Sequence, residues 1–167
     1  MRFKNWKTFY VHGSEFRVPS MFLNTECYGN FTIYPNEAFQ GCAQSVELYL
    51  GIEAFDKEKA ADYQYLVQAE SLLEGVQQHY VNRKIYDRND RIISQIDHWK
   101  LKKGKALFQA IVQHRTKTYE FDEEYSSTTF LASFQQNEKF YVVQLTGQSD
   151  VMPYLLQDFK KIVYSCK

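Results

Sequence analysis

The chain has few of the residues that interrupt or cross-link a fold. It contains three cysteines, three prolines and seven glycines among 167 residues. Cys27, Cys42 and Cys166 are odd in number, far apart and without C-x-x-C spacing, so free thiols are predicted, with neither a zinc site nor a disulfide framework. So little proline and glycine argues against a disordered linker. The length predicts a single domain spanning residues 1–167.

Long apolar runs and a net charge are absent as well. No stretch approaches the roughly 20 apolar residues that cross a bilayer, and the first residues lack the apolar core of a signal peptide. We therefore expect no membrane insertion and, unless a leader has been removed, a cytoplasmic location. The 20 basic residues are balanced by 20 acidic ones, which leaves no net field to attract nucleic acid. Nucleic acid is therefore not an expected partner.

Aromatic residues, by contrast, are abundant. Thirteen Tyr, thirteen Phe and two Trp make up 17% of the chain. Such side chains favour half-buried pleated surfaces, which predicts a sheet-rich protein. A tyrosine prefers to keep its hydroxyl in water, so several tyrosines are expected at the surface. They either form part of an interface or are present simply because strands tolerate them.

Periodic patterns predict the elements in the first half of the chain. Short strands are expected within residues 6–18 and at 30–34, and residues 45–52 alternate apolar and polar positions, the period of a strand with one buried face. One helix is predicted from residue 56 to about residue 80, because Asp56 can cap it and its apolar residues recur every three or four positions. Its outward face is predicted to carry four glutamines: Gln64, Gln68, Gln77 and Gln78.

The second half of the chain predicts an antiparallel meander. Polar breaks separate the expected strands, which are residues 83–86, 91–101, 105–120, 126–135 and 139–146. A closing helix follows, capped by Ser149 or Asp150, with Asp158, Lys160 and Lys161 pointing outward. Its apolar stripe, which is expected to face the core, consists of Met152, Leu155, Phe159, Ile162 and Cys166. The predicted class is therefore α+β: an antiparallel meander sheet with one long helix packed across it and a closing C-terminal helix.

The end of the chain carries a resemblance to a known family. The stretch YVVQLTG, a short spacer and DFKKIVYS, together with an early FRVP, resemble the PsbP-like fold family. That family includes an extrinsic subunit of photosystem II, a Ran-binding nuclear-import factor and bacterial secretion-chaperone relatives. Its members mainly bind other proteins, so the resemblance implies a binding or adaptor role. The long segment between Pro19 and Gln44 departs from the family pattern, and no functional residue is carried over.

Catalytic and metal-binding patterns are sparse. Cys42, after a glycine, is the best nominal nucleophile, with His79, His98 or His114 as a remote base; the alternative is a small packed thiol. His98 follows Asp97 directly, and neighbours on a strand point to opposite faces, so the two do not share a metal readily. No metal and no cofactor is predicted.

Two charged connections are the candidate binding residues. Positive charge gathers at a predicted hairpin turn around Gly104, at Lys100, Lys102, Lys103 and Lys105. Negative charge gathers in the next connection, at Glu120, Asp122, Glu123 and Glu124. Consecutive connections of a meander lie at opposite ends, so the two clusters would give the molecule a charge dipole that orients a protein partner. Solvated loops are the alternative interpretation.

Three functions remain open from the sequence. The first is a non-catalytic protein-binding module, such as a secretion chaperone, a toxin-neutralising immunity protein or an adaptor, whose partner is another protein. The second is a small hydrolase that uses Cys42 with a histidine base. The third is an apolar-ligand-binding protein whose sheet and helix enclose a pocket, for which the aromatic content would serve.

Overall fold

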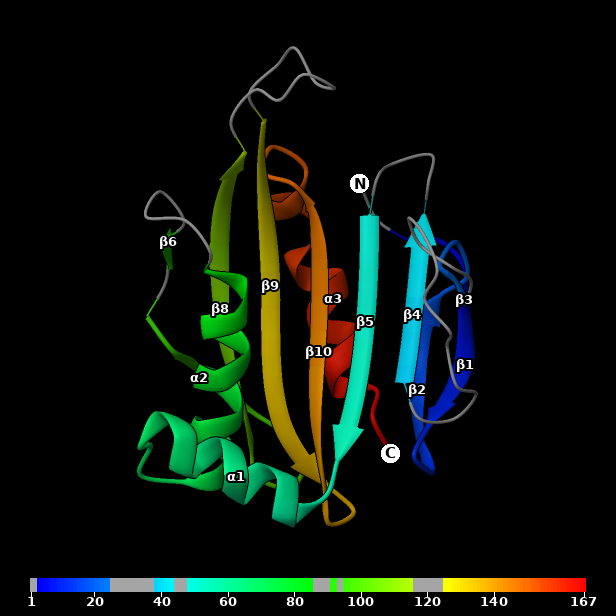
Figure 1. Cartoon of the computed structure of the whole chain (residues 1–167). Coiled ribbons are helices and arrows are strands. Elements are labelled where there is room, and N and C mark those ends of the chain that lie inside the picture. The colour runs from blue at the N-terminus through cyan, green and yellow to red at the C-terminus, as the bar shows by residue number, and fades with distance from the viewer. Residues whose placement is uncertain (1–2, 25–37, 44–47, 86–90, 93–94, 116–124) are drawn as a thin grey trace.

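The protein consists of three layers built around one large antiparallel sheet. The computed structural model describes residues 3–24, 38–43, 48–85, 91–92, 95–115 and 125–167. Helices α1 (Lys57–Val67) and α2 (Leu72–Lys84) lie on one face of the sheet. Helix α3 (Leu156–Tyr164) and a separate hairpin of β1 (Trp6–Val11) and β2 (Ser14–Pro19) lie on the other face (Figure 1). The predicted α+β class is confirmed.

The sheet of the described residues has eight strands. They are β3 (Leu23–Asn24), β4 (Ala38–Ala43), β5 (Leu48–Phe55), β6 (Arg91–Ile92), β7 (Asp97–Lys100), β8 (Lys105–Arg115), β9 (Tyr125–Gln136) and β10 (Lys139–Gln148). The order in the sheet is β3-β4-β5-β10-β9-β8-β6, with β7 also paired to β8. Neighbours β8, β9 and β10 are consecutive and antiparallel, which confirms the predicted meander.

Two strand predictions differ from the structure. The stretch 91–101 forms two short strands, β6 and β7, because both pair separately with β8. Residues Arg83 and Lys84, predicted to begin a strand, form the end of α2, and residue 86 lies outside the described part. The strand predicted over residues 45–52 begins, in the described part, at Leu48 and continues to Phe55. Its alternation is confirmed at Leu48, Leu50 and Ile52, which are buried.

The long helix predicted from residue 56 is divided into two. Asp56 caps α1 as predicted, by accepting a hydrogen bond of 2.9 Å from the amide of Lys59. Gln68 then adopts a left-handed conformation with φ of 55°, which ends the helix. Ser71 starts α2 by accepting a hydrogen bond of 3.2 Å from the amide of Glu74. The apolar stripe continued across this break, which concealed it in the sequence.

The two helices approach each other closely at Gly75. A Cβ atom at this position would lie 2.5 Å from the Cα atom of Gln64 in α1. Because the obstacle is backbone, it cannot rotate away as the end of a flexible side chain can. Glycine is therefore required by the contact between the two helices.

For one polar residue of α2, the predicted orientation is wrong. Gln77 was predicted to face outward, but it is fully buried against the sheet. Its amide donates hydrogen bonds to Gln109 Oε1 at 3.2 Å and to the Leu131 carbonyl at 3.4 Å, and its Oε1 accepts one from Ser133 at 2.6 Å. Partners on β8 and β9 compensate the burial of this polar side chain.

The closing helix confirms its predicted stripe but not its predicted cap. Met152 and Leu155, in the 3-10 turn η2 (Met152–Leu155), and Phe159 and Ile162 are buried as expected. Neither η2 nor α3 has a side-chain cap. Ser149 instead accepts hydrogen bonds from the Ser126 and Thr128 hydroxyls at 2.6 and 2.8 Å.

The predicted orientation of Asp158 on its helix is also wrong. It is 1% exposed, although it was predicted to point outward. Its Oδ2 accepts a hydrogen bond of 3.1 Å from the amide of Phe3, and its Oδ1 lies 3.6 Å from the Lys161 ammonium. A carboxylate on the inner side of α3 therefore holds the start of the described chain against the closing helix.

Replacement of Gly75 tests the contact between α1 and α2. Alanine normally stabilises a helix interior by about 1 kcal/mol relative to glycine. We expect Gly75→Ala to lower the free energy of unfolding by about 1–2 kcal/mol instead, because overpacking outweighs the gain in helix propensity. Urea unfolding followed by circular dichroism measures the change, with Gln78→Ala as an exposed control on α2. A variant more stable than the original would contradict the close contact.

Replacement of Asp158 tests the buried carboxylate. Asp158→Ala should lower the free energy of unfolding by about 1–3 kcal/mol, because the buried Phe3 amide loses its acceptor. Asp158→Asn keeps an oxygen acceptor and should cost less. Lys161→Ala removes the ion pair and the contact with the Trp6 ring, both made by an exposed ammonium, and should cost about 1 kcal/mol or less. Equal losses for all three variants in urea unfolding would show that the amide contact is unimportant.

Candidate functional site

The turn between β7 and β8 presents a group of lysines. Gly104, with φ of 82°, allows the reversal, and the Leu101 amide donates a hydrogen bond of 3.0 Å to the Gly104 carbonyl. This short connection leaves the side chains of Lys100, Lys102 and Lys103 exposed. The hairpin predicted from the sequence at this position is therefore present.

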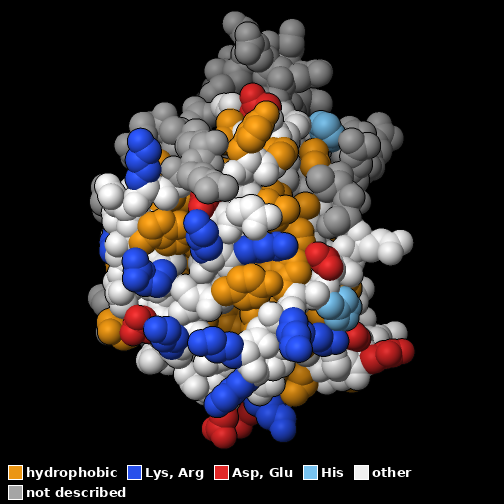
Figure 2. Space-filling view, turned by 180° about the vertical axis from the view of Figure 1, so that it is seen from behind, with side chains coloured by type: hydrophobic (Ala, Val, Ile, Leu, Met, Phe, Trp, Pro, Cys, Tyr) orange, Lys and Arg blue, Asp and Glu red, His pale blue; other side chains and the backbone are white. Residues whose placement is uncertain are grey.

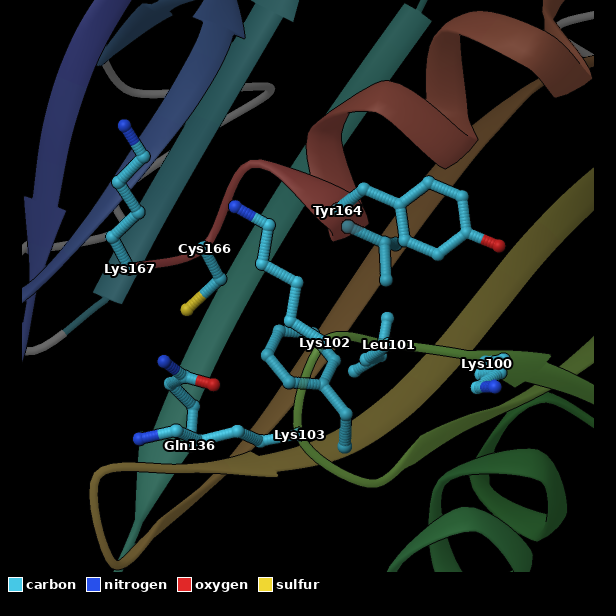
Figure 3. Close-up of a pocket in the computed structure, with 10 residues that line it drawn as sticks. Lys100, Leu101, Lys102, Lys103, Gln136, Tyr164, Cys166 and Lys167 are labelled. Atoms are coloured by element: carbon cyan, nitrogen blue, oxygen red, sulfur yellow. The ribbon is translucent and has the colours of Figure 1, made fainter.

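A hollow of about 510 Å³, here named the lysine hollow, lies between this turn and the end of the chain (Figure 3). One wall is the β7–β8 turn, a second comes from β9, and the third from the end of α3 and the residues after it. The lining residues are Lys100, Leu101, Lys102, Lys103, Phe134, Gln136, Val163, Tyr164, Cys166 and Lys167.

The third wall is held in place by β2. The backbone of Lys167 exchanges two hydrogen bonds of 3.0 Å with the backbone of Glu15, in the manner of a short added strand. The Ser165 hydroxyl accepts a further hydrogen bond of 2.8 Å from the amide of Arg17. These contacts fix Cys166 and Lys167 opposite the lysine turn, although about 60 residues separate them from it in sequence.

The floor of the lysine hollow is apolar. Phe134 is fully buried and Val163 is 1% exposed, while Leu101 packs at the edge of the same core. The ring of Tyr164 is 48% exposed, so it remains available for contact. Burial raises the pKa of the Cys166 thiol from 9.0 to about 12, partly offset by a hydrogen bond with Ser14. This cysteine is therefore a protonated thiol at neutral pH.

The charge around the lysine hollow is uncompensated. Its lining includes four lysines and no acidic residue. Among the described residues Lys161 pairs with Asp158, and both lie outside this lining. On α3, the ammonium groups of Lys160 and Lys161 lie over the rings of Trp99 and Trp6, at 4.9 and 6.0 Å. Figure 2 shows Lys and Arg side chains gathered around apolar surface on this side of the molecule.

Lys105 belongs to a neighbouring hollow. This second hollow, of about 500 Å³, is lined by Lys103, Lys105 and the β9–β10 turn, which includes Glu138. Three of the four lysines singled out in the sequence thus line the lysine hollow, and the fourth faces a surface of mixed charge.

The predicted acidic cluster lies outside the described residues. Glu120, Asp122, Glu123 and Glu124 fall between the end of β8 at Arg115 and the start of β9 at Tyr125. These two strand ends lie at the far end of β8 from Lys105. The position of the acidic residues, the charge dipole and their role in binding therefore all remain predictions.

The backbone positions keep Cys42 away from the predicted bases. Cys42 in β4 pairs with Tyr49, and the same row continues through Thr146, Thr129 and Ile111 of β8. Four strand spacings separate β4 from β8, about 19 Å. His114 lies on β8 and His98 lies on β7 beyond it. A hydrogen bond needs roughly 3 Å, so neither histidine reaches Cys42.

The third histidine lies at the other end of the sheet. The His79 ring stacks on Tyr63 with centroids 3.9 Å apart, and Tyr63 packs against Phe55. Phe55 is six residues along β5 from the partner of Cys42, about 20 Å. Burial, followed by the charges of Arg83 and Lys59, lowers the pKa of His79. Among the described residues there is also no group of three metal-ligating side chains.

The fold is shared with solved structures of Mog1 and of a PsbP, as the sequence resemblance predicted. The chain is similar to the Ran-binding protein Mog1p of Saccharomyces cerevisiae, with a TM-score of 0.51 and 8% identity over 98% of this chain and 95% of that one. A mutant of the protein Mog1 gives a TM-score of 0.54 and 9% identity over 98% and 96%. Cyanobacterial PsbP (CyanoP) from Synechocystis gives 0.52 and 12% over 97% and 91%. The TM-scores show a shared fold, and at identities this low they show nothing further.

The sequence itself matches no protein-family model and no curated protein. In the described part of the chain, no helix combines the length and the apolar composition required to cross a bilayer. The lysine hollow and its surroundings are therefore the features from which a function can be inferred.

The raised pKa of Cys166 predicts a slow thiol. With Cys27 and Cys42 replaced by serine, iodoacetamide should label Cys166 at mildly alkaline pH about tenfold or more slowly than in urea, because thiolate is the reactive form. The folded pKa lies above the unfolded one, so this group stabilises the fold below pH 9 and loses that contribution as the pH rises toward 12. Equal labelling rates in the two states would contradict the burial.

The same measurement tests the hydrolase alternative. In a chain that retains only Cys42, a fast rate and a low thiol pKa would indicate an activated nucleophile. A rate equal to that of the unfolded chain would remove the reason for considering catalysis there.

Proposed function

We propose that this protein is a non-catalytic protein-binding module of the adaptor type, which holds its partner at the lysine hollow. The observation that carries the proposal is the set of exposed ammonium groups around an apolar floor, with no acidic residue in the lining. Apolar contact supplies affinity, while uncompensated charge steers and orients an oppositely charged partner. A secretion chaperone or an immunity protein would use such a surface in the same way.

Two further observations support binding over catalysis. The candidate nucleophile Cys42 is about 19 Å from the strand that carries His114, by strand spacing. A protein of the same fold, Mog1p, is described as Ran-binding. The fold thus accommodates protein recognition, and the lysine hollow offers a surface suited to it.

The volume of the hollow favours a second candidate function. Small-molecule sites commonly measure about 300–1,000 Å³, a range that includes this hollow. An amphipathic anion, with its apolar part on Leu101 and Tyr164 and its charge on the lysines, would use the same residues. The protein would then be a ligand carrier.

Charge reversal on the turn tests the proposed function. The tagged protein, recovered from its native cells, should capture one protein in stoichiometric amount. Lys102→Glu combined with Lys103→Glu should abolish that capture, because both ammonium groups line the hollow. Mass spectrometry identifies and quantifies the captured protein.

The matched control changes the same number of charges on the opposite face of the sheet. Lys57→Glu with Lys59→Glu alters two exposed lysines in the first turn of α1, where acidic residues are tolerated. This control should capture the partner normally, and circular dichroism should show both variants folded. Capture that survives reversal of Lys102 and Lys103 would exclude the turn as the docking surface.

A further inference from the structure

We propose that the segment bound in the lysine hollow is an extended acidic stretch of a partner protein with one bulky apolar side chain, which enters the hollow between the lysines. This inference rests on the proposed function and specifies the chemistry of the partner. It depends on how the charges are distributed, on the apolar floor, and on where the basic surface ends.

The positive charges are spread along the hollow. Figure 3 shows Lys167 and Lys100 on opposite sides, with Lys102 between them. An extended polypeptide advances about 3.3 Å per residue, so acidic side chains along it meet successive ammonium groups. Lysine is suited to this role because its flexible stem lets a point charge adjust to each carboxylate. A ligand with a single anionic head group would meet only part of this set.

The floor demands more than charge from its occupant. Partly exposed Leu101 and the half-exposed Tyr164 ring offer apolar surface, and the buried side chains of Phe134 and Val163 support it from beneath. Interfaces derive most of their affinity from a few bulky anchors buried in such depressions. An aromatic or large aliphatic side chain of the partner would pack there, and its removal from water would strengthen the surrounding charge pairs.

The extent of the basic surface argues against a polynucleotide. Beyond Lys103 the neighbouring hollow contains Glu138 as well as Lys105, so an acidic residue interrupts the positive charge there. On α3, Lys160 and Lys161 lie over tryptophan rings. A nucleic-acid strand needs a basic groove that follows its backbone over several phosphates, and the chain as a whole has a net charge of zero. A short acidic peptide segment fits the limited length of this surface.

Synthetic peptides test the inference directly. The reference peptide has aspartates and glutamates flanking one central phenylalanine; in a second peptide serine replaces the phenylalanine, and in a third lysines replace the acids. We expect measurable binding of the first by calorimetry, binding about tenfold weaker for the second, and none for the third. The affinity for the reference peptide should fall as salt is added.

Variants of the full chain locate the peptide. Lys102→Glu with Lys103→Glu should lower the affinity for the reference peptide by about tenfold or more, while Lys57→Glu with Lys59→Glu should leave that affinity unchanged. Tyr164→Ser should weaken the phenylalanine peptide more than the serine peptide. Tyr154→Ser is its matched control, because Tyr154 is 71% exposed and does not line the hollow. A Tyr164→Ser effect equal on both peptides would contradict the anchor.

Other ligands decide between the alternatives. Tighter binding of a fatty-acid anion or of a single-stranded oligonucleotide than of the reference peptide would overturn the inference. Absence of peptide binding would also overturn it. If capture of a cellular protein nevertheless depended on Lys102 and Lys103, the proposed function would stand with a partner of different chemistry. If the peptide did not bind and capture of a cellular protein did not depend on Lys102 and Lys103, both the proposed function and this inference would be wrong.

Discussion

Strand β10 is the element on which every layer depends. It pairs with β9 along its whole length and with β5 over seven residues, so neither edge is open. Both faces are buried as well: Tyr141, Val143 and Leu145 belong to the core beneath α3, while Phe140 and Val142 belong to the core beneath α1 and α2. The Tyr141 hydroxyl also donates a hydrogen bond of 2.5 Å to Ser14, which ties the β1–β2 hairpin to the sheet. The near-continuous apolar sequence of β10 reflects burial on both sides.

Sequence patterns correctly predicted the strands and helices whose buried face follows from the spacing of their own apolar residues. The alternation around Leu50 and the stripe through Phe159 each follow from one buried face. The errors arose where contacts with residues distant in sequence determine whether a side chain is buried. Polarity assigned Gln77 and Asp158 to the surface, yet each forms hydrogen bonds inside the protein with partners 32 to 155 positions away. The break at Gln68 was hidden because apolar spacing continued through it, and the capping role of Ser71 becomes evident only once a second helix is recognised.

The candidate site likewise combines residues that are neighbours in sequence with residues that are distant in sequence. The charge of the β7–β8 turn was visible in the sequence, because Gly104 and its flanking lysines are neighbours. The apolar floor and the opposite wall were not, since Phe134, Tyr164 and Lys167 come from β9 and from the end of the chain. Cys166 was expected in the core, and its half-buried position between core and hollow depends on β2. Sequence spacing thus indicated one wall of a site that three separate segments build.

The pairing of Lys167 with Glu15 has a kinetic consequence. The neighbouring bond from Arg17 to Ser165 joins residues 148 positions apart, so this corner closes nearly the entire chain into a loop. Loop-closure entropy rises with the logarithm of loop length, and contacts of high order are associated with slow folding. The wall of the lysine hollow forms at the lowest entropic cost once the intervening sheet has brought its two segments together. A partner that docks there would bind the finished molecule and pass over folding intermediates.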